Sequence, residues 1–262
     1  MKEDLVSIVT PTYNCGKFIT ETIESVIGQT YKNWEMIIVD DCSKDNTQEI
    51  VKKYLKNDKR IKYIKFEKNQ GAAIARNTAI REAKGRYIAF LDSDDLWSKN
   101  KLEKQINFMN KNNYDFTYTN YEEIDENSKL LGIRVTGPKE ITKKGMYNYC
   151  WPGCLTVMYD AEKIGLIQIK DIKKNNDYAM WLKICKKANC YLLDENLAMY
   201  RKRAGSISNH GYTLLIKWHY KLYRDVEHKN IIFSLFNTFR NIIFGIYKKK
   251  KYCSMEITNG KR

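Results

Sequence analysis

Residues 86–95 of this chain are Arg-Tyr-Ile-Ala-Phe-Leu-Asp-Ser-Asp-Asp. The apolar run from Tyr87 to Leu91 predicts a buried strand, which three carboxylates follow: Asp92, Asp94 and Asp95. Side chains at the carboxyl end of such a strand face the ligand site of an open α/β sheet. Three acids this close repel one another unless a cation neutralises them, which favours a site for Mg²⁺ or Mn²⁺. The alternative is an acidic turn in which Asp94 or Asp95 caps the next helix.

The chain before this stretch alternates strands with helices. Apolar, β-branched runs predict strands over residues 5–11, 34–39 and 61–66. Apolar residues at helical spacing predict helices over residues 17–28 and 72–83, with another after Ser43. Four strands separated by three helices indicate a doubly wound, parallel α/β sheet.

A second predicted strand also ends in acids. Asp40 and Asp41 follow directly on Val39. Because the carboxyl ends of parallel strands lie at the same edge of a sheet, these acids are expected to share one crevice with Asp92, Asp94 and Asp95. That convergence favours metal and ligand binding over a simple helix cap.

The second half of the chain has a less regular pattern. It predicts helices over residues 102–109 and 176–187, and strands over residues 114–121, 130–135, 155–158 and 191–200. No composition shift marks a domain boundary before about residue 210.

Charge is distributed unevenly along the 262 residues, whose formal net charge is +15. Residues 1–100 contain 17 Lys and Arg against 15 Asp and Glu, whereas residues 213–262 contain 11 against 3. The basic excess therefore lies partly in the tail, which favours an anionic surface as partner. The length suits one substantial core, or one core with a small appended region.

The seven cysteines are irregularly spaced and form no CxxC pair, and the three histidines complete no zinc pattern. This usage favours free thiols in a reducing compartment. The first residues do not resemble a signal peptide, and no run of 18 apolar residues occurs. We therefore expect a cytoplasmic protein.

Three blocks of sequence together resemble the family-2 glycosyltransferases with the GT-A fold. They are VSIVTPTYNCGKFITETIESVIGQTYKNWEMIIVDDCSKDN (residues 6–46), GAAIARNTAI (residues 71–80) and GRYIAFLDSDDLW (residues 85–97). Two weaker blocks, which begin at Asn176 and Tyr200, extend the resemblance to about residues 4–209. It implies an α/β fold with a doubly wound, mostly parallel sheet flanked by helices, and a small C-terminal helical region.

The same resemblance implies how the chain is divided and what it does. Residues 1–209 would be the catalytic domain, with a nucleotide-sugar half over residues 1–100 and an acceptor half over residues 101–209. Residues 210–262 would be a basic amphipathic helical tail. The implied activity is inverting, metal-dependent transfer of a sugar from a nucleotide donor, a UDP-sugar, to a saccharide or lipid-linked glycan acceptor in bacterial surface polysaccharide synthesis.

Roles for single residues follow from the resemblance too. Asp41 would accept a hydrogen bond from the uracil imide, Tyr13 would stack on the base, and Asp94 or Asp95 would ligate Mn²⁺ or Mg²⁺. The other residues of the nucleotide-sugar site would be Thr10, Pro11, Asp40, Gly71, Arg76, Asp92 and Arg203.

Asp177 would be the general base, because the acceptor hydroxyl must lose its proton as it attacks the anomeric carbon. The alternative is a plain helix cap. Two departures from the family occur. Asn176 stands where many relatives have an acid, and Arg203 stands where they often have a histidine. An arginine cannot ligate a cation but pairs with a diphosphate; alternatively, Arg201 and Arg203 are solvated loop charges.

The tail combines apolar residues at helical spacing with basic residues, and ends its apolar segment in four lysines, Lys248–Lys251. This composition favours peripheral binding to an anionic membrane surface, at the inner face of the cell membrane. The alternatives are packing on the catalytic domain and a dimer contact. No recognition motif supports nucleic-acid binding.

Two other functions compete with glycosyl transfer. A nucleotidyltransferase that makes the nucleotide sugar would share the sheet and the acids. However, it should have a glycine-rich, basic loop after the first strand, which residues 11–16 lack. A binding protein could keep the pocket without the chemistry.

Overall fold

The structure is a computed structural model that describes residues 2–172, 174–203 and 212–255. Within these ranges eleven strands form one sheet. The strands are β1 (Lys2–Thr12), β2 (Trp34–Asp40), β3 (Ile61–Lys65), β4 (Gly85–Phe90), β5 (Leu96–Trp97), β6 (Phe116–Ile124), β7 (Leu130–Val135), β8 (Glu140–Ile141), β9 (Met158–Asp160), β10 (Cys190–Arg201) and β11 (Cys253–Met255). The α-helices are α1 (Ile19–Ile27), α2 (Thr47–Asn57), α3 (Ala72–Glu82), α4 (Lys101–Asn112), α5 (Lys143–Asn148), α6 (Ala161–Ile164), α7 (Asn176–Ile184), α8 (Tyr212–Lys221) and α9 (Ile231–Tyr252). A 3₁₀ turn, η1 (Cys154–Thr156), and a π-helical turn, η2 (Leu222–Val226), complete the set.

The first half of the chain forms the parallel part of the sheet, in the order β3–β2–β1–β4. Thr12 of β1 lies opposite Asp40 of β2, and Val9 lies opposite Phe90 of β4. The carboxyl ends of β2 and β4 therefore lie on either side of the end of β1. The predicted mostly parallel sheet flanked by helices is confirmed.

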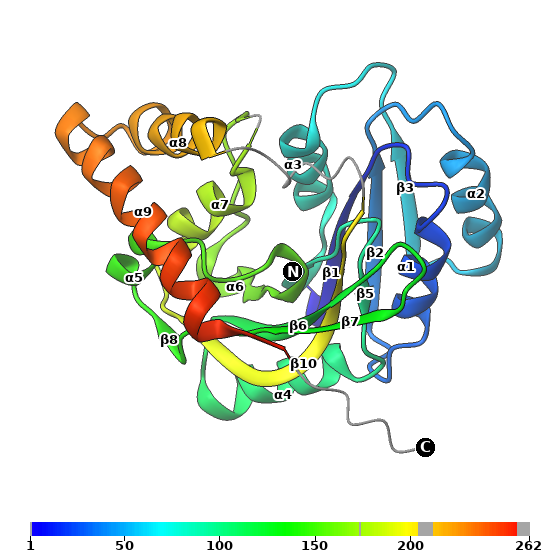
Figure 1. The fold of residues 1–262 in the computed structure, drawn as a ribbon. Helices are drawn as coiled ribbons and strands as arrows, with labels where there is room; N and C mark the ends of the chain where they lie inside the picture. Colours follow the sequence, from blue (N-terminus) through cyan, green and yellow to red (C-terminus); the bar gives the residue numbers. More distant parts are fainter. Residues whose placement is uncertain (1, 173, 204–211, 256–262) are drawn as a thin grey trace.

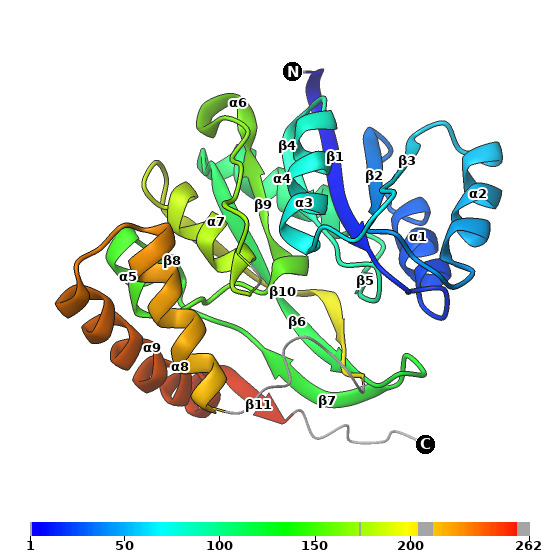
Figure 2. The ribbon, with the colours of Figure 1, turned by 90° about the horizontal axis from the view of Figure 1, so that it is seen from above.

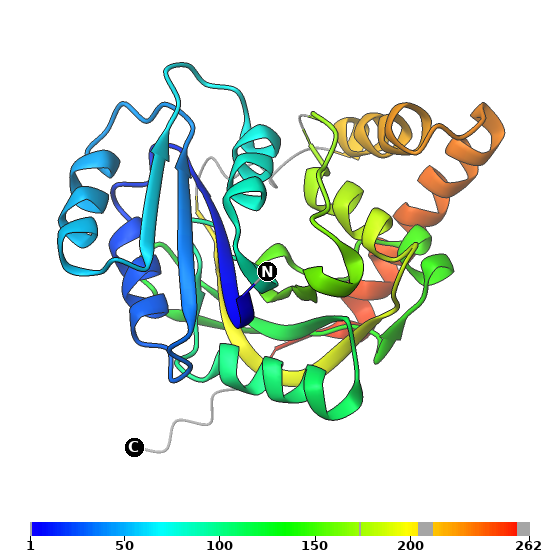
Figure 3. The same ribbon diagram turned by 180° about the vertical axis from the view of Figure 1, so that it is seen from behind.

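Strict alternation along the strands builds a core on each face of this sheet. In β4, Tyr87 and Ala89 belong to the core under α1 and α4, whereas Ile88 and Phe90 belong to the core under α3 and α7. All four side chains are buried, as expected for a strand covered by helices on both faces. Figures 1 and 3 show α3 on the opposite face of the sheet from α1 and α2.

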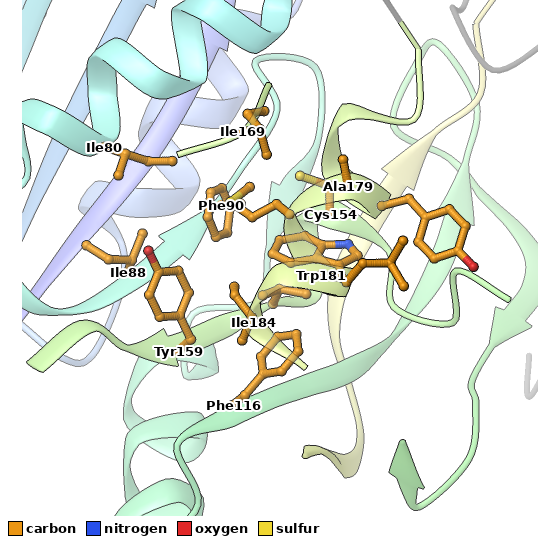
Figure 4. Packing of buried hydrophobic residues seen from close by; sticks show 14 of the residues in the cluster. Ile80, Ile88, Phe90, Phe116, Cys154, Tyr159, Ile169, Ala179, Trp181 and Ile184 are labelled. Atoms are coloured by element: carbon orange, nitrogen blue, oxygen red, sulfur yellow. The ribbon is translucent and has the colours of Figure 1, made fainter. Parts of the chain in front are cut away.

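The core under α3 and α7 centres on Trp181, which has no exposed surface. Its ring meets Phe90 edge-on, with ring centroids 5.2 Å apart, and lies 5.9 Å from the ring of Phe116 (Figure 4). Trp181 thus joins α7 to strands from both halves of the chain. This packing fixes where the start of α7 lies relative to the end of β4.

The second half extends the sheet with antiparallel pairs. β9 pairs antiparallel with both β4 and β6, and β7 pairs antiparallel with β6. β10 runs parallel to β6 and also pairs with β5 and β8, so it branches from the main order of strands.

A C-terminal helical region of α8, η2 and α9 lies at the end of the molecule opposite α1 and α2 (Figure 1). After α9 the chain returns to the sheet, where β11 pairs antiparallel with β7 and Cys253 lies opposite Val135. The division of the chain at residue 209 stays a prediction. Among the helices of the described ranges, none is both long enough and apolar enough to cross a membrane.

Candidate active site

The loops that follow β1 and β2 are tied to each other at the carboxyl edge of the sheet. The backbone N–H of Asn14 donates to Ser43 Oγ at 2.9 Å, and the N–H of Lys44 donates to Asn14 Oδ1 at 2.8 Å. Asn14 has a left-handed backbone with φ of 49°, which asparagine tolerates better than most residues. These bonds hold the base side of the predicted donor pocket.

The residues predicted to line that pocket at the end of β1 and just after it differ in exposure. Thr10 and Pro11 are buried within the strand, whereas Tyr13 is 48% exposed. Exposure of an aromatic face next to a strand end suits stacking on a flat ligand.

Asp40 is committed to holding the protein together. Its carboxylate accepts hydrogen bonds from the N–H of Ser43, at 2.7 Å, and from the Tyr63 hydroxyl, and the residue has no exposed surface. Asp40 therefore supports the turn after β2, and its predicted place in the nucleotide-sugar site stays a prediction.

Asp41 brackets the turn that starts α3. One carboxylate oxygen accepts from the N–H of Gln70 at 2.6 Å and the other from the N–H of Gly71 at 2.8 Å. Gly71 has φ of 91° and ψ of 155°, a conformation that is essentially restricted to glycine. The predicted pair Asp41 and Gly71 is thus in direct contact.

Arg76 of α3 joins the end of β4 to the start of α7. Its guanidinium donates to Asp92 Oδ1 at 2.5 Å through Nη2 and to the Asn176 side-chain oxygen through Nη1. Burial opposes the charge of Arg76, but the carboxylates of Asp92 and Asp177 outweigh it and raise its pKa. Arg76 is 7% exposed and organises the acids. Because Asn176 stands where many relatives have an acid, the second acceptor for the Arg76 guanidinium is a neutral amide.

Asp177 stands in the first turn of α7, where Oδ1 accepts from the N–H of Tyr178 at 2.8 Å. Burial raises the pKa of Asp177; Arg76 and the Tyr178 N–H oppose that rise, and Asp92 adds to it. A carboxylate whose pKa is raised accepts a proton more readily. Asp177 therefore has the electrostatic character of a base, in addition to its local contact with its own helix.

The last two acids of the opening stretch have different environments. Asp94 keeps 18% of its side chain exposed and accepts from Arg203 Nε at 2.6 Å. Asp95 is 1% exposed, and its Oδ1 accepts from the N–H of Arg201 at 2.9 Å. Burial raises the pKa of both carboxyls, and the charges of the neighbouring aspartates raise it further.

Arg201 is not a solvated loop charge. Its guanidinium donates to Asp94 O at 2.7 Å, to Ser128 Oγ at 2.8 Å and to Glu21 at 3.1 Å. It therefore clamps the acidic turn to β10, to α1 and to the hairpin between β6 and β7. Arg203 makes its ion pair with Asp94 directly. The rest of the predicted closing loop, residues 204–208, lies outside the described ranges, as does His210.

The acidic residues could supply only one or two of the ligands of a divalent ion. Among the described residues, no three His, Cys, Asp or Glu side chains converge closely enough to hold an ion by themselves. Asp94 offers accessible oxygens and Asp92 keeps 30% of its side chain exposed, whereas Asp95 is enclosed. Mg²⁺ is typically bound by one or two carboxylates together with water and substrate phosphates. The residues present fit that mode.

Sequence reasoning missed Cys154, which reaches the site from η1. Burial raises the pKa of its thiol, the charges of Asp92 and Asp177 raise it further, and that of Arg76 opposes them. Figure 4 shows Cys154 beside Trp181 and Ala179 of α7. Nothing in the local sequence marks this cysteine; the antiparallel pairing of β9 with β4 brings η1 to the strand ends.

Comparison with known proteins gives the same family as the sequence blocks. The family model described as Glycosyl transferase family 2 matches residues 7–157. The putative teichuronic acid biosynthesis glycosyltransferase TuaG of Bacillus subtilis (strain 168) is 43% identical over 224 residues, which cover 85% of this chain and 88% of TuaG. The UDP-Glc:alpha-D-GlcNAc-diphosphoundecaprenol beta-1,3-glucosyltransferase WfgD of Escherichia coli is 39% identical over 264 residues, which cover 100% of both chains.

Solved structures show the same fold. Residues 1–349 of S. aureus TarS, in complex with UDP-GlcNAc, align with a TM-score of 0.70 and 24% identity over 87% of this chain and 69% of TarS. The mannosyltransferase PcManGT from Pyrobaculum calidifontis, in complex with GDP-Man and Mn²⁺, aligns with a TM-score of 0.60 and 16% identity over 92% of this chain and 75% of PcManGT. At these identities the likeness concerns the fold alone.

The family model covers more than half of this chain, and TuaG and WfgD match it over most of their own lengths. The competing assignment as a nucleotidyltransferase is thereby set aside, and the predicted enzyme class is confirmed. This chain is a glycosyltransferase that belongs to glycosyl transferase family 2.

Proposed function

We propose that the enzyme transfers a sugar from a UDP-sugar to a lipid-linked glycan acceptor, with inversion and with help from a divalent ion, in bacterial surface polysaccharide synthesis. The observation that carries this proposal is the bridge from Asp92 through Arg76 to Asn176, because it places the acids of the donor side next to the base candidate Asp177. The names of WfgD and TuaG support the donor, the lipid-linked acceptor and the pathway class.

On the donor side, we assign the base pocket to Thr10, Pro11, Tyr13 and Asp41. Tyr13 has the exposed ring needed for stacking. Both oxygens of Asp41 already accept one backbone N–H each, and each retains a lone pair with which to accept the uracil imide N–H. Gly71 leaves open space where a Cβ would project, so backbone can approach the nucleotide closely there. Asp40 supports this wall from behind.

On the phosphate side, we assign Asp94 as the ligand of Mn²⁺ or Mg²⁺ and Asp92 as a partner for sugar or ribose hydroxyls. A divalent ion supplies charge neutralisation of the leaving diphosphate. Asp95, enclosed and bonded to the Arg201 N–H, holds the turn that carries Asp94. Arg203 pairs with Asp94 and provides a second positive charge for the diphosphate.

On the acceptor side, Asp177 takes the proton of the attacking hydroxyl. Its raised pKa helps because a stronger base removes the proton more completely in the transition state. Arg76 opposes the effect of burial on the pKa of Asp177 and so favours its ionised form. One direct displacement at the anomeric carbon then inverts its configuration. We place this reaction at the inner face of the cell membrane, where a lipid-linked acceptor is held.

The decisive experiment supplies purified enzyme with a panel of UDP-sugars and lipid-linked acceptors and identifies the product by mass spectrometry. We expect turnover with one UDP-sugar, a loss of about 100-fold or more in EDTA, and recovery on addition of Mn²⁺. Asp94→Asn should weaken Mn²⁺ binding by roughly 10-fold or more in the presence of UDP, measured by the EPR signal of free Mn²⁺.

The exposed Asp171 provides the matched control, because Asp171→Asn removes the same charge outside the site. Full turnover in EDTA, together with wild-type Mn²⁺ binding by Asp94→Asn, would remove the metal from the proposal. Absence of transfer from every UDP-sugar, with transfer from another nucleotide sugar, would overturn the donor assignment.

A further inference from the structure

Helix α9 has buried polar residues on its inner face and exposed large apolar residues on its outer face. Four polar side chains on its inner face are at most 4% exposed: Ser234, Asn237, Thr238 and Asn241. The outer face carries six large apolar residues that are 47–81% exposed: Ile232, Leu235, Phe236, Phe239, Ile243 and Ile246. Their spacing of three and four residues places them on one side of the helix. We call these six residues the outer face.

The orientation of α9 is fixed by specific contacts. Asn241 Nδ2 donates to the Tyr178 hydroxyl at 3.2 Å and to the Tyr223 hydroxyl at 3.4 Å. Tyr178 Oη lies 2.8 Å from Tyr223 Oη, and Tyr178 donates to Met146 O at 2.7 Å. Rotation of α9 to bury the outer face would break this buried network, and buried polar groups left without partners are costly. The buried hydrogen bonds of Asn241 therefore keep the outer face exposed.

Basic residues accompany this apolar surface. Lys249, Lys250 and Lys251 fill the last turn of α9, and Arg240 lies along its length. Helix α8 lies beside α9 (Figure 2). It carries the exposed residues Leu215 and Ile216 and the basic residues Lys217 and Lys221. The exposed apolar residues of the outer face mark an interaction site, and the basic residues of the same helix favour an anionic partner.

We propose that α9 lies in the surface of an anionic lipid bilayer, with the outer face immersed between the headgroups and Lys249–Lys251 bound to their phosphates. A basic helix with one apolar face binds in the plane of the interface in this way. Pairing of two copies with their α9 helices parallel would bring the lysine clusters of both copies together, which disfavours it.

This placement deepens the proposed function. The residue that holds α9, Asn241, bonds to Tyr178, which directly follows Asp177. The bilayer-bound helix therefore fixes the height of the base above the membrane, where a lipid-linked sugar presents its hydroxyl. The acceptor part of this inference rests on the proposed function, whereas bilayer binding does not.

Vesicle co-sedimentation of the full chain tests the inference. We expect binding to vesicles that contain phosphatidylglycerol, weaker binding to pure phosphatidylcholine, and release at high salt. Phe236→Asp with Phe239→Asp should lower the partition coefficient at least about 10-fold, because two charges replace immersed rings. Replacement of Lys249, Lys250 and Lys251 by glutamine should abolish the preference for phosphatidylglycerol.

Leu130→Asp with Leu131→Asp is the matched control, since these β7 residues are 49% and 43% exposed but lie away from α9. It should bind vesicles as the wild type does. Both double variants should keep the wild-type melting temperature, which separates lost binding from unfolding.

Activity provides the second readout. Phe236→Asp with Phe239→Asp should lose transfer to an acceptor embedded in vesicles, yet retain transfer to a short-chain, water-soluble analogue within about twofold. If neither the wild type nor any variant transferred a sugar to any acceptor, the proposed function would be contradicted. The inference of bilayer binding would still be decided by the vesicle measurements. Equal vesicle binding by wild type and the α9 variant would overturn the inference, as would a wild-type dimer in light scattering that this variant converts to a monomer.

Discussion

A single substitution at Asp177, at the start of α7, tests its proposed role as the base. Asp177→Asn keeps the size of the side chain and removes its ability to accept a proton. We expect kcat to fall by about 10² to 10⁴, with the Kd for UDP within twofold of wild type. Stopped-time assays and calorimetric titration with UDP measure the two quantities, and Asp171→Asn is the control.

The pH profile sharpens this test. Because burial raises the pKa of Asp177, the rate should fall as the pH drops through that raised value, where the base becomes protonated. The acidic limb should be absent from the residual activity of Asp177→Asn. An unchanged acidic limb in the variant would assign the limb to another group.

Substitution of Arg76 tests how much its buried contacts contribute to the free energy of unfolding. Arg76→Met removes the buried partner of Asp92 and Asn176, and breaking a buried pair typically costs about 3–5 kcal/mol. Urea unfolding should show this loss, of which Arg76→Lys recovers part. Arg81→Met, at an exposed position of the same helix, should unfold as the wild type does. Equal midpoints for the two methionine variants would contradict the bridging role.

The sequence predicts which acids lie at the carboxyl edge of the sheet, but it does not predict the side-chain partners of several of them. Acids after two predicted parallel strands had to meet at one edge, so Asp41 and Asp94 could be found by pattern alone. Strand order cannot tell which acid is enclosed. Asp40 bonds to Tyr63 and Asp95 to Arg201, and both contacts depend on side-chain packing that no spacing encodes.

The turn that starts α3 requires a backbone conformation that favours glycine at residue 71. Gly71→Ala should destabilise the protein by about 1–3 kcal/mol, because an alanine is strained at φ of 91°. No atom lies within 4 Å of the added Cβ, so the backbone alone carries the penalty. The Kd for UDP should rise as well, since Asp41 holds the Gly71 N–H.

Gly145→Ala in α5 is the control, because its added Cβ would make ordinary contacts of 3.4 Å and 3.6 Å. It should keep or slightly raise the melting temperature. Equal melting temperatures for both alanine variants would show that the turn relaxes to accommodate a side chain.

The parallel elements were predictable and the antiparallel ones less so. β1, β2 and β4 each contain a run of mostly apolar, buried residues because helices cover both faces, and such runs are easily recognised in a sequence. β9 and β11 span three residues each, too few for a period to show, and their pairing with β4 and β7 is set by distant parts of the chain.

For the whole molecule, stability should depend on pH through His219. Burial lowers its pKa from 6.5 to about 4, so the folded state favours neutral imidazole and the unfolded state binds the additional proton. Stability from this group is complete above pH 6.5 and declines as the pH falls toward 4. The unfolding free energy should drop by about 2 kcal/mol between pH 7 and pH 5 on this account.

His219→Gln should remove that part of the pH dependence in urea unfolding. His228→Gln, at an exposed position, should keep it. A wild-type slope in His219→Gln would mean that other groups carry the acid sensitivity.

The pairing of β11 with β7 bears on how the protein is made. The donor side, from β1 to β4, leaves the ribosome first. The outer edge of β7 stays uncovered until residues 253–255 have been synthesised, and an uncovered strand edge recruits other chains. Between the emergence of β7 and the arrival of β11, nascent chains are therefore open to edge-to-edge association.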